Sequence, residues 1–405
     1  MSRFLPYSPE QAYLLPPSVK DVLPEGHLCF FVHQVVDKLD LSRFEQAYGE
    51  EGGTLYAPAM MLSVWLYAYA TGLTSARQLE KRMREDLGLR YLAGGAGPDH
   101  WALSAFRRRH RRGINDGFTQ VLELIRDTQL GRLGRVVVDS TPVAAQNGRG
   151  RVDSRQRLRK DRARYRRQIR RWQRECERAD SGESSEYAAE QMQRAQQRLA
   201  ELPGRLERLE KSGETKLPRT DPEARVLRKR GQSVIGYTAE VAVSEDHFIV
   251  AERVKQAKAD NAALLPMVEE VKRNCREQPG QVLADAGYYS NRNLTQLRQQ
   301  GMDAYVPDPN LAHELNTGKR ARGLGCMRVR NPEGKAMRAK LRTQAGREVY
   351  ARRKGIVEPV FGTLKAQRDL RRFRLRGLAK VGIEFTLAAI GYNLTRWRQE
   401  QGASE

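Results

Sequence analysis

The sequence is poor in the residues that build several common kinds of protein site. Its 405 residues include only 4 cysteines and 6 histidines, and aromatic residues make up 7% of the chain. The cysteines stand singly, without a C-x-x-C spacing, which argues against a zinc ribbon or a disulfide framework and favours a reduced, cytosolic protein. The histidines show neither an H-E-x-x-H motif nor another paired spacing, so a histidine-based zinc site is not expected.

Several other motifs are missing as well. There is no G-x-x-x-x-G-K-[ST] motif, so ATP use is not indicated, and no G-x-S-x-G or Cys/His arrangement points to acyl hydrolysis. No apolar run reaches about 18 residues, the length that a membrane-spanning helix needs. The stretch 1–6 lacks the basic and apolar regions of a signal peptide. We therefore expect a protein that is neither secreted nor embedded in a membrane.

Positive charge is the most pronounced feature of the composition. Lys and Arg number 72 against 49 Asp and Glu, which gives a formal net charge of +23 and a pI near 10.1. A surplus of this size predicts a polyanionic partner. The chain is long enough for two or three domains, and a hydrophobic content of 40% permits a globular fold with a sizeable core.

Three isolated acids stand in apolar surroundings within this basic chain. Asp139 directly follows the run 136–138 (Val-Val-Val), and Asp285 follows the run 282–284 (Val-Leu-Ala). Such runs are typical of buried strands, so both carboxylates are expected at strand ends, at one rim of a sheet. Glu358 is expected on a later helix that packs across this sheet. A lone acid at a strand end is often only a turn cap, so the combination of acids and basic charge carries the functional argument.

The chemistry that suits three such acids is metal-dependent phosphoryl transfer. Hard carboxylate oxygens with open positions suit Mg²⁺ or Mn²⁺, which keep waters and bind substrate phosphates. Two such ions about 3.5–4 Å apart can activate a water or a 3′-hydroxyl and stabilise the leaving oxygen. The sequence therefore predicts this chemistry on nucleic acid.

The order of predicted elements after residue 130 indicates a mixed α/β sheet. Strands are expected over 135–146, 233–243, 247–254, 281–284 and 303–307, with the second and third forming a β-hairpin. Helices are expected from 260 to about 275, from 291, and around 357–366, with a final amphipathic helix over 382–399. Residues 308–345 are basic and rich in glycine, which predicts a long loop.

The region from 1 to about 130 is expected to be helical. Residues 57–71 are apolar nearly all round, which predicts a buried helix. A later helix, capped by Asp99, is expected to carry Trp101, Leu103 and Phe106 on one side. Its other side and the residues that follow are strongly basic, and they include Arg107, Arg108, Arg109 and Arg111. Short helices with tight turns and one basic helix resemble a helix-turn-helix arrangement, although an ordinary bundle with a solvated charged face gives the same pattern.

An arginine-rich insertion separates the first predicted strand from the hairpin. Residues 151–171 are dense in arginine, including Arg166 and Arg167, and a second helix is expected over 186–202. The pattern predicts an inserted helical hairpin, which we place at 148–215. Its charge fits either a solvated, partly disordered coiled segment or an arm that contacts phosphates.

Three segments together resemble bacterial insertion-sequence transposases of the DDE type. They are 138–141 (Val-Asp-Ser-Thr), 284–288 (Ala-Asp-Ala-Gly-Tyr) and 358–365 (Glu-Pro-Val-Phe-Gly-Thr-Leu-Lys). The last resembles the C-terminal signature of the family, in which a Lys follows the Glu with six residues between them. Tyr350 and Arg353 resemble the Tyr and the basic residue that precede the Glu. Four residues separate Arg353 from the Glu, where the commonest form of the signature has three.

The resemblance implies an α/β protein with a ribonuclease-H-like mixed-sheet catalytic domain (131–147 and 216–405) beside an N-terminal helical DNA-binding domain (1–130). The inserted basic hairpin would lie near DNA. Asp139, Asp285 and Glu358 would hold two Mg²⁺ or Mn²⁺ ions, while Lys365, Arg353 and Tyr350 would contact the DNA.

The same resemblance implies a transposase of the bacterial cytoplasm, associated with the nucleoid. It would bind the terminal inverted repeats of its element as a homodimer on double-stranded DNA, cleave a strand at each end and join the freed 3′-hydroxyl to target DNA. Two alternatives stay open. One is a metal-dependent nuclease that cuts without joining, and the other is a non-catalytic DNA-binding protein derived from a transposase.

Overall fold

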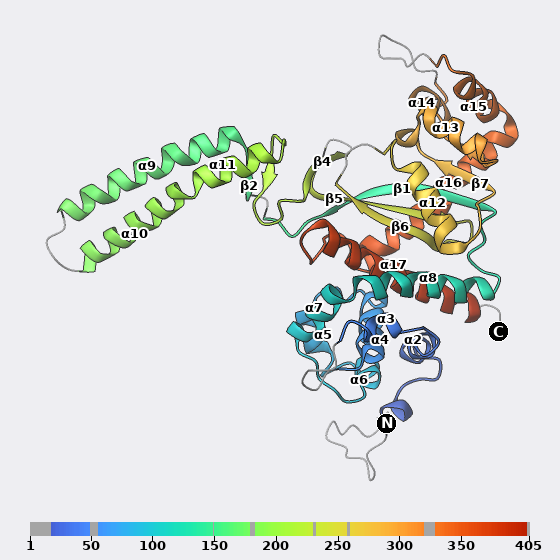
Figure 1. The fold of residues 1–405 in the computed structure, drawn as a ribbon, viewed down its shortest axis with the longest axis horizontal. Helices are drawn as coiled ribbons and strands as arrows, with labels where there is room; N and C mark the ends of the chain where they lie inside the picture. Colours follow the sequence, from blue (N-terminus) through green and yellow to red (C-terminus); the bar gives the residue numbers. More distant parts are fainter. Residues whose placement is uncertain are drawn as a thin grey trace, which may run out of the picture.

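The computed structural model describes residues 18–48, 56–148, 150–178, 183–229, 232–256, 260–319 and 329–402. A six-stranded mixed sheet lies at the centre (Figure 1), with strand order β4-β5-β1-β7-β8 and with β6 also paired to β5. Its strands are β1 (Arg135–Ala144), β4 (Arg225–Lys229), β5 (Gln232–Ser244), β6 (Ile249–Lys255), β7 (Gln281–Ala284) and β8 (Asp303–Tyr305). The predictions of a mixed α/β sheet and of a hairpin from β5 and β6 are confirmed, whereas β4 was not predicted.

β1 is the strand on which the sheet changes direction. It pairs antiparallel with β5 on one side and parallel with β7 on the other. Its parallel partner ends early, because β7 stops at Ala284, which is paired with Val138. The two acids that follow these paired residues therefore come from neighbouring strands at the same level of the sheet.

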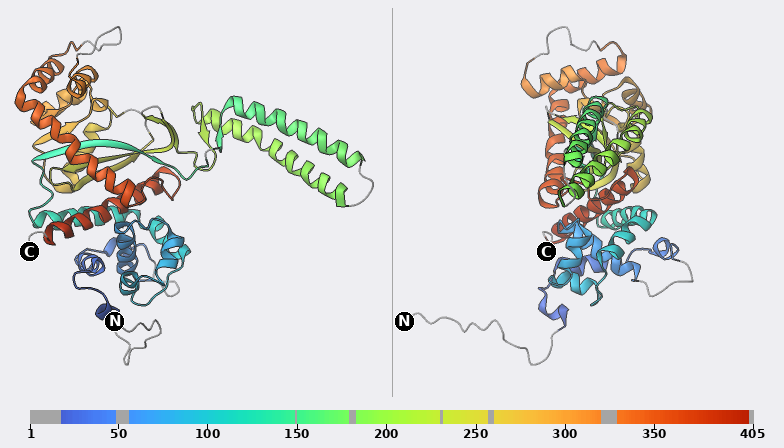
Figure 2. Two further views of the ribbon diagram at one scale, coloured as in Figure 1. Left: turned by 180° about the vertical axis from the view of Figure 1, so that it is seen from behind. Right: turned by 90° about the vertical axis from the view of Figure 1, so that its left-hand side faces the viewer.

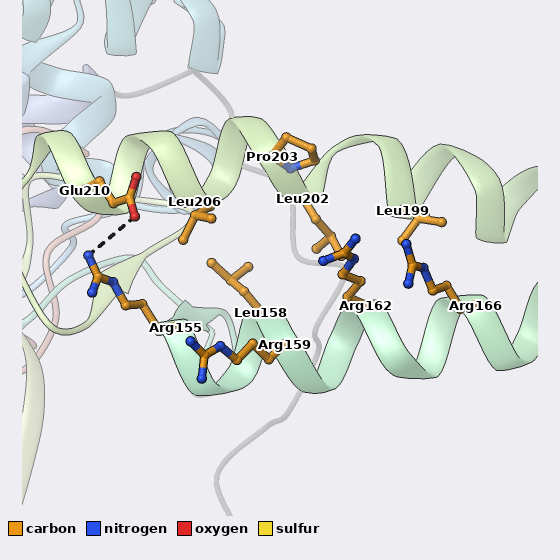
Figure 3. A pocket seen from close by; sticks show the side chains of 10 residues that line it. All are labelled: Arg155, Leu158, Arg159, Arg162, Arg166, Leu199, Leu202, Pro203, Leu206 and Glu210. Carbon is orange, nitrogen blue, oxygen red and sulfur yellow. Dashed lines mark hydrogen bonds and ion pairs between the residues drawn. The ribbon is translucent and has the colours of Figure 1, made fainter.

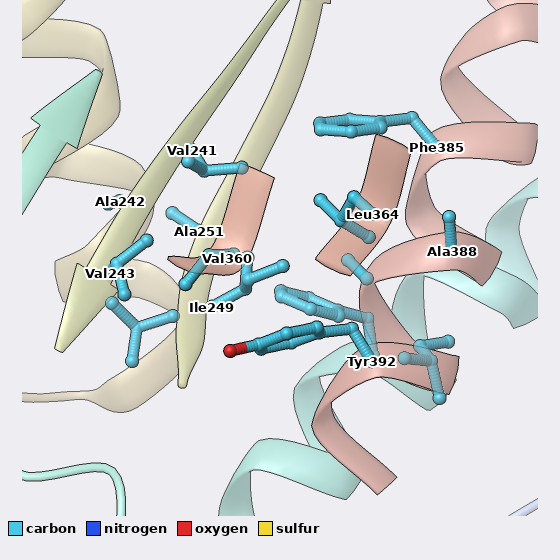
Figure 4. Close-up of a cluster of buried hydrophobic side chains, with 14 of the residues drawn as sticks. Val241, Ala242, Val243, Ile249, Ala251, Val360, Leu364, Phe385, Ala388 and Tyr392 are labelled. Carbon is cyan, nitrogen blue, oxygen red and sulfur yellow. The ribbon is translucent and has the colours of Figure 1, made fainter. Parts of the chain in front are cut away.

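Helices cover both faces of the sheet (Figures 1 and 2). α12 (Leu264–Cys275) lies on one face, while α16 (Gln344–Gly362) and α17 (Leu378–Gly402) cover the other. Figure 4 shows apolar side chains of β5 and β6 meeting those of α16, the turn that follows it and α17; they include Val241, Ile249, Val360, Leu364 and Phe385. Because side chains alternate along a strand, Asp139, which is paired with Val241, faces α16.

The N-terminal region is helical, as predicted, and packs onto α17 (Figure 1). Its helix α4 is buried from Met61 to Ala70, in agreement with the apolar pattern. A Cβ on Gly391 of α17 would lie 2.8 Å from the backbone nitrogen of Ala70, so the glycine allows the two helices to approach closely. The helices are α1 (Val19–Val22), α2 (Leu28–Val36), α3 (Ser42–Glu45), α4 (Pro58–Ala70), α5 (Ala76–Arg82), α6 (Leu87–Leu92), α7 (His100–Arg109) and α8 (Arg111–Asp127).

The prediction that the last helix is amphipathic is wrong. α17 is buried on nearly all sides between Val381 and Leu394. The reason is its position, because it lies between the sheet and the N-terminal helices and so contacts protein on both sides (Figure 1). The predicted division into domains 1–130, 131–147 with 216–405, and 148–215 stays a prediction. The first two parts share one hydrophobic core, to which α17 contributes.

A helical arm projects from the sheet (Figures 1 and 2). It consists of α9 (Arg155–Arg178), α10 (Glu183–Ala200) and α11 (Leu202–Lys211), and its neck is the two-stranded pairing of β2 (Val152–Asp153) with β3 (Leu217–Pro218). The arm has a small core of its own, which contains Leu158, Tyr165, Leu202, Leu209 and Leu217. This separate core allows the arm to extend away from the body.

The predicted long loop over 308–345 is wrong for the residues that the structure describes. It contains α14 (Pro309–Thr317) and α15 (Pro332–Arg342), while 320–328 lie outside the described residues. Asp308 caps α14 through its carboxylate and pairs with Arg338 of α15 at 2.7 Å. A cap and an ion pair between distant residues thus organise a stretch whose glycine content suggested a loop. The remaining elements are η1 (Ala286–Tyr288), α13 (Asn291–Gln299) and the π-helical turn Thr363–Gln367.

Gly236 of β5 is expected to be intolerant of a side chain. A Cβ there would lie 1.9 Å from the carbonyl oxygen of Val143 on the neighbouring strand, and a backbone atom cannot turn aside. We expect Gly236→Ala to cost about 3 kcal/mol or more of unfolding free energy, measured by urea denaturation. Gly382→Ala is the matched control: its Cβ would meet nothing within 4 Å, and in a helix it should add up to about 1 kcal/mol. Equal effects of the two changes would contradict this account.

No helix in the described part of the chain is both long and apolar enough to cross a membrane.

Candidate active site

Asp139 and Asp285 lie next to each other at the rim where β7 ends. The register pairs Val138 with Ala284, so the two acids are the next residues on adjacent parallel strands. Asp285 caps the short helix η1, because its Oδ1 accepts a hydrogen bond from the Gly287 amide at 2.9 Å. The prediction that Asp139 lies at a strand end is wrong, because β1 continues to Ala144. The shorter neighbour, rather than the end of β1, creates the rim.

α16 brings a guanidinium and a phenol to these acids. Arg353 Nη1 lies 3.2 Å from Asp139 Oδ2, and the two side chains are only 12% and 16% exposed. The Tyr350 ring centroid is 5.8 Å from the guanidinium carbon of Arg353. Burial raises the pKa of Tyr350, and the nearby negative charges of Asp285 and Asp139 add to this, while the Arg353 charge opposes it. Tyr350 therefore stays a neutral phenol beside the acids.

Lys365 reaches the same strand further along. It lies in the π-helical turn after α16, and its Nζ contacts Thr141 Oγ1 and lies 3.2 Å from the Pro142 carbonyl oxygen. Thr141 follows Asp139 by two residues and so faces the same side of the sheet. An ammonium group is thus held close to the rim.

Glu358 is the predicted acid that the structure does not bring into the group. Its side chain is exposed, and the described residues contain no set of three or more His, Cys, Asp or Glu placed to hold a metal ion. Lys365 follows it by seven positions, with the end of α16 and the start of the π-helical turn between them.

A second polar cluster lies behind the rim, on the opposite face of the sheet, and it was not predicted. Glu240 is fully buried on β5, paired with Ser140 across the strands, and forms an ion pair with Lys255 of β6. Lys255 Nζ also lies 3.0 Å from Asp260 Oδ1. Burial raises the pKa of Glu240, and Lys255 opposes that rise. The sequence offered one signal for this cluster, because Glu240 and Lys255 are charged residues within two largely apolar strands.

The predicted DNA-contacting arginines of the N-terminal region divide into buried and exposed groups. Arg107 is 2% exposed, donates to the Tyr69 hydroxyl and lies 3.8 Å from the Trp65 ring centroid. The prediction that Arg107 contacts DNA is wrong, because its guanidinium is buried inside the N-terminal region. Trp101, expected on the apolar side of its helix, is 67% exposed. The remaining arginines of this set are exposed: Arg108, Arg109 and Arg111.

Arg166 and Arg167 are exposed on α9 of the arm. α9 carries 12 basic residues against 3 acids over its 24 residues. Arg166 borders a cavity of about 630 Å³ between α9 and the helices opposite (Figure 3), with an apolar floor and arginines at its edge. The apolar side chains of that floor are Leu158, Leu199, Leu202, Pro203 and Leu206.

Comparison with known protein families gives two matches. Residues 17–109 match a transposase domain family, and residues 212–394 match the transposase DDE domain, which has a ribonuclease-H-like fold. Asp285 and Glu358 fall within the second match, whereas Asp139 and the arm lie between the two. Searches of curated proteins and of solved structures find no match. Since both matched regions describe transposases, the chain belongs to the insertion-sequence DDE transposases.

Proposed function

We propose that this protein binds the terminal inverted repeats of its own element, cleaves a DNA strand at each end and joins the freed 3′-hydroxyl to target DNA. The observation that carries the proposal is the register of β1 with β7, which places Asp139 beside Asp285, a residue of the matched transposase DDE domain. DDE transposases are enzymes that cut and transfer DNA strands and generally use divalent metal ions. A net charge of +23 favours a polyanionic substrate.

The donor chemistry at the rim fits a hard divalent cation. Asp139 and Asp285 offer carboxylate oxygens, the ligands that Mg²⁺ and Mn²⁺ prefer, and Glu358 lies on α16, the helix whose Arg353 contacts Asp139. Bound there, two such ions would supply an activated oxygen nucleophile and stabilisation of the leaving oxygen. Completing the site with a third acid requires the exposed Glu358 side chain to turn toward Asp139 and Asp285.

The cationic side chains around the rim are suited to hold the phosphates of the substrate. Arg353 and Lys365 contact β1 directly, and both can exchange these contacts for phosphate oxygens, since guanidinium and ammonium groups bind phosphate strongly. Tyr350, a neutral phenol, can donate a hydrogen bond to an oxygen of the strand. These residues would orient the scissile phosphate for in-line attack by water in the first step and by a 3′-hydroxyl in the second.

We assign the DNA surface outside the rim to two helical regions. In the N-terminal region it comprises Arg108, Arg109 and Arg111, with the exposed Trp101 on the same helix as the first two. On the arm it comprises Arg166 and Arg167 of α9. The two ends of an element must be joined together, so we propose that the protein acts as a homodimer on double-stranded DNA.

The arm gives a measurable prediction for DNA affinity. Replacing Arg166 and Arg167 by Gln removes two exposed charges from α9, and each lost phosphate contact should lower the slope of log K against log salt by about 0.9. Arg194→Gln with Arg198→Gln removes the same charge from α10, so it controls for net charge alone. Fluorescence anisotropy over a salt series measures both slopes. A slope that changes equally in the two pairs would argue against α9 as a specific DNA surface.

A product assay tests the function itself. The protein is incubated with labelled DNA that carries the element's own ends and with target DNA, in Mg²⁺, Mn²⁺ or EDTA. We expect metal-dependent nicks at the element boundary and, in addition, strands joined to the target. Nicked strands without joined products would indicate a nuclease, and binding without cleavage in any metal would indicate a non-catalytic DNA-binding protein.

A further inference from the structure

A chain of charged side chains connects the interior of the sheet to the turn that carries Asp285. Lys255 links Glu240 on β5 to Asp260, which precedes α12. Glu240 is fully buried, and the side chain of Lys255 is 11% exposed. Burying a charge is costly unless it is paired, so the position of each of these two groups depends on the other.

Asp260 borders the same glycine as Asp285. A Cβ on Gly287 would lie 3.0 Å from Asp285 Oδ1 and 3.3 Å from Asp260 Oδ2. Two carboxylates this close repel each other, and the Lys255 ammonium is the positive group that Asp260 contacts. The lysine therefore favours the position of Asp260 against the turn of η1.

We propose that Lys255 is a positioning residue for the metal-binding rim: it holds Asp260 against the Gly287 turn and so fixes the direction of the Asp285 carboxylate. The inference rests on the proposed function, because it assumes that Asp285 is a metal ligand. Groups that orient metal ligands without touching the metal typically change metal affinity by 10–100-fold when removed. Lys255 reaches the rim from the face of the sheet opposite Arg353.

Two other roles for Lys255 predict different results. If it only neutralises buried Glu240, removing both charges together leaves metal binding unchanged. If Asp260 is itself a metal ligand that competes for Lys255, removing the lysine frees that carboxylate and strengthens metal binding. Only the positioning role predicts weaker binding when Lys255 and Glu240 are neutralised together.

The test is Mn²⁺ binding by the full-length protein without DNA, followed by the electron paramagnetic resonance signal of free Mn²⁺. Glu240→Gln with Lys255→Met keeps the net charge and leaves no buried unpaired ion. We expect about tenfold weaker Mn²⁺ binding, while thermal stability and DNA affinity stay near wild type. Unchanged or tighter Mn²⁺ binding in this double variant would overturn the proposal.

Single variants complete the test. Asp260→Asn should also weaken Mn²⁺ binding, since it removes the carboxylate that Lys255 contacts at the η1 turn. Glu269→Gln, which removes an ion pair with Lys272 on α12, should leave Mn²⁺ binding unchanged. Asp285→Asn defines the site-specific signal, and its failure to reduce Mn²⁺ binding would overturn both proposals. Site-specific Mn²⁺ binding without DNA cleavage would contradict the proposed function alone and leave the role of Lys255 to be decided by the double variant.

Discussion

Asp285→Asn is expected to lower the rate of strand cleavage about a thousandfold, while DNA binding persists. Losing one group that stabilises charge in a transition state costs on the order of 100–1000-fold, and a lost metal ligand removes the stabilisation of both the attacking and the leaving oxygen. The fold should survive, because an Asn Oδ1 can still accept the hydrogen bond that the Gly287 amide donates. Strand cleavage of labelled element ends in Mg²⁺ and Mn²⁺ measures the effect.

Asp303→Asn is the control for this prediction. Asp303 begins β8 beside Gln281, at the opposite end of β7 from Asp285, and pairs with Lys340. The change is the same in chemistry but lies away from the rim, so cleavage should stay close to wild type. If Asp285→Asn cleaves as fast as this control, Asp285 is not a metal ligand and the proposed site is refuted.

Arg205→Ala is expected to lower the free energy of opening the arm by about 3 kcal/mol, the low end of the cost of breaking a buried ion pair, because Asp153 and Asp161 keep Arg219 as their other partner. Arg205 Nε lies 3.0 Å from Asp153 Oδ2, and its Nη2 also reaches Asp161 at 3.4 Å. The side chains of all three are no more than 7% exposed. These contacts tie α11 to β2 and α9, where the arm leaves the body. Amide hydrogen exchange in α9 should therefore accelerate on the order of a hundredfold or more.

Arg155→Ala provides the contrast, because its ion pair with Glu210 is exposed on both sides (72% and 51%). Pairs of that kind contribute about 0–1 kcal/mol, so exchange in α9 should change little. A similar acceleration in both variants would show that the buried network does not anchor the arm.

The same network predicts an acid-sensitive arm. Burial alone would raise the pKa of Asp153, but hydrogen bonds from Arg205 and Arg219, with their charges, outweigh it and lower the pKa. A pKa lowered by folding means that the stabilisation is present above the ordinary value for Asp and is lost as pH falls through the folded value. Protection of the α9 amides from hydrogen exchange should therefore stay constant from neutral pH to about pH 4 and decline below it.

Local patterns in the sequence were sufficient for the elements that bury apolar faces. The run 136–138 predicted β1, and the all-round apolar stretch of α4 predicted a buried helix, because burial on every side leaves little room for polar residues. The same reasoning failed for α17 and for 308–345. α17 is covered by two layers from different parts of the chain, and the helices of the second region depend on the long-range pair of Asp308 with Arg338.

The candidate site shows the same limit. Spacing and resemblance selected Asp139, Asp285 and Lys365, which the fold gathers around β1. They could not distinguish Arg107, which is buried against Trp65, from its exposed neighbours. The motif also did not reveal that Arg353 pairs with Asp139 while Glu358 stays exposed, since side-chain direction on α16 depends on how the helix docks.

The sequence by itself determined the chemical character of this protein: a basic chain, a family resemblance and acids placed after apolar runs, all of which are local or compositional features. Only the tertiary structure decided which charges meet. The pairing of β1 with β7, the contact of Arg353 with Asp139 and the chain from Glu240 through Lys255 to Asp260 join residues distant in sequence. Such contacts arise from strand register and helix docking, which depend on the packing of the whole core.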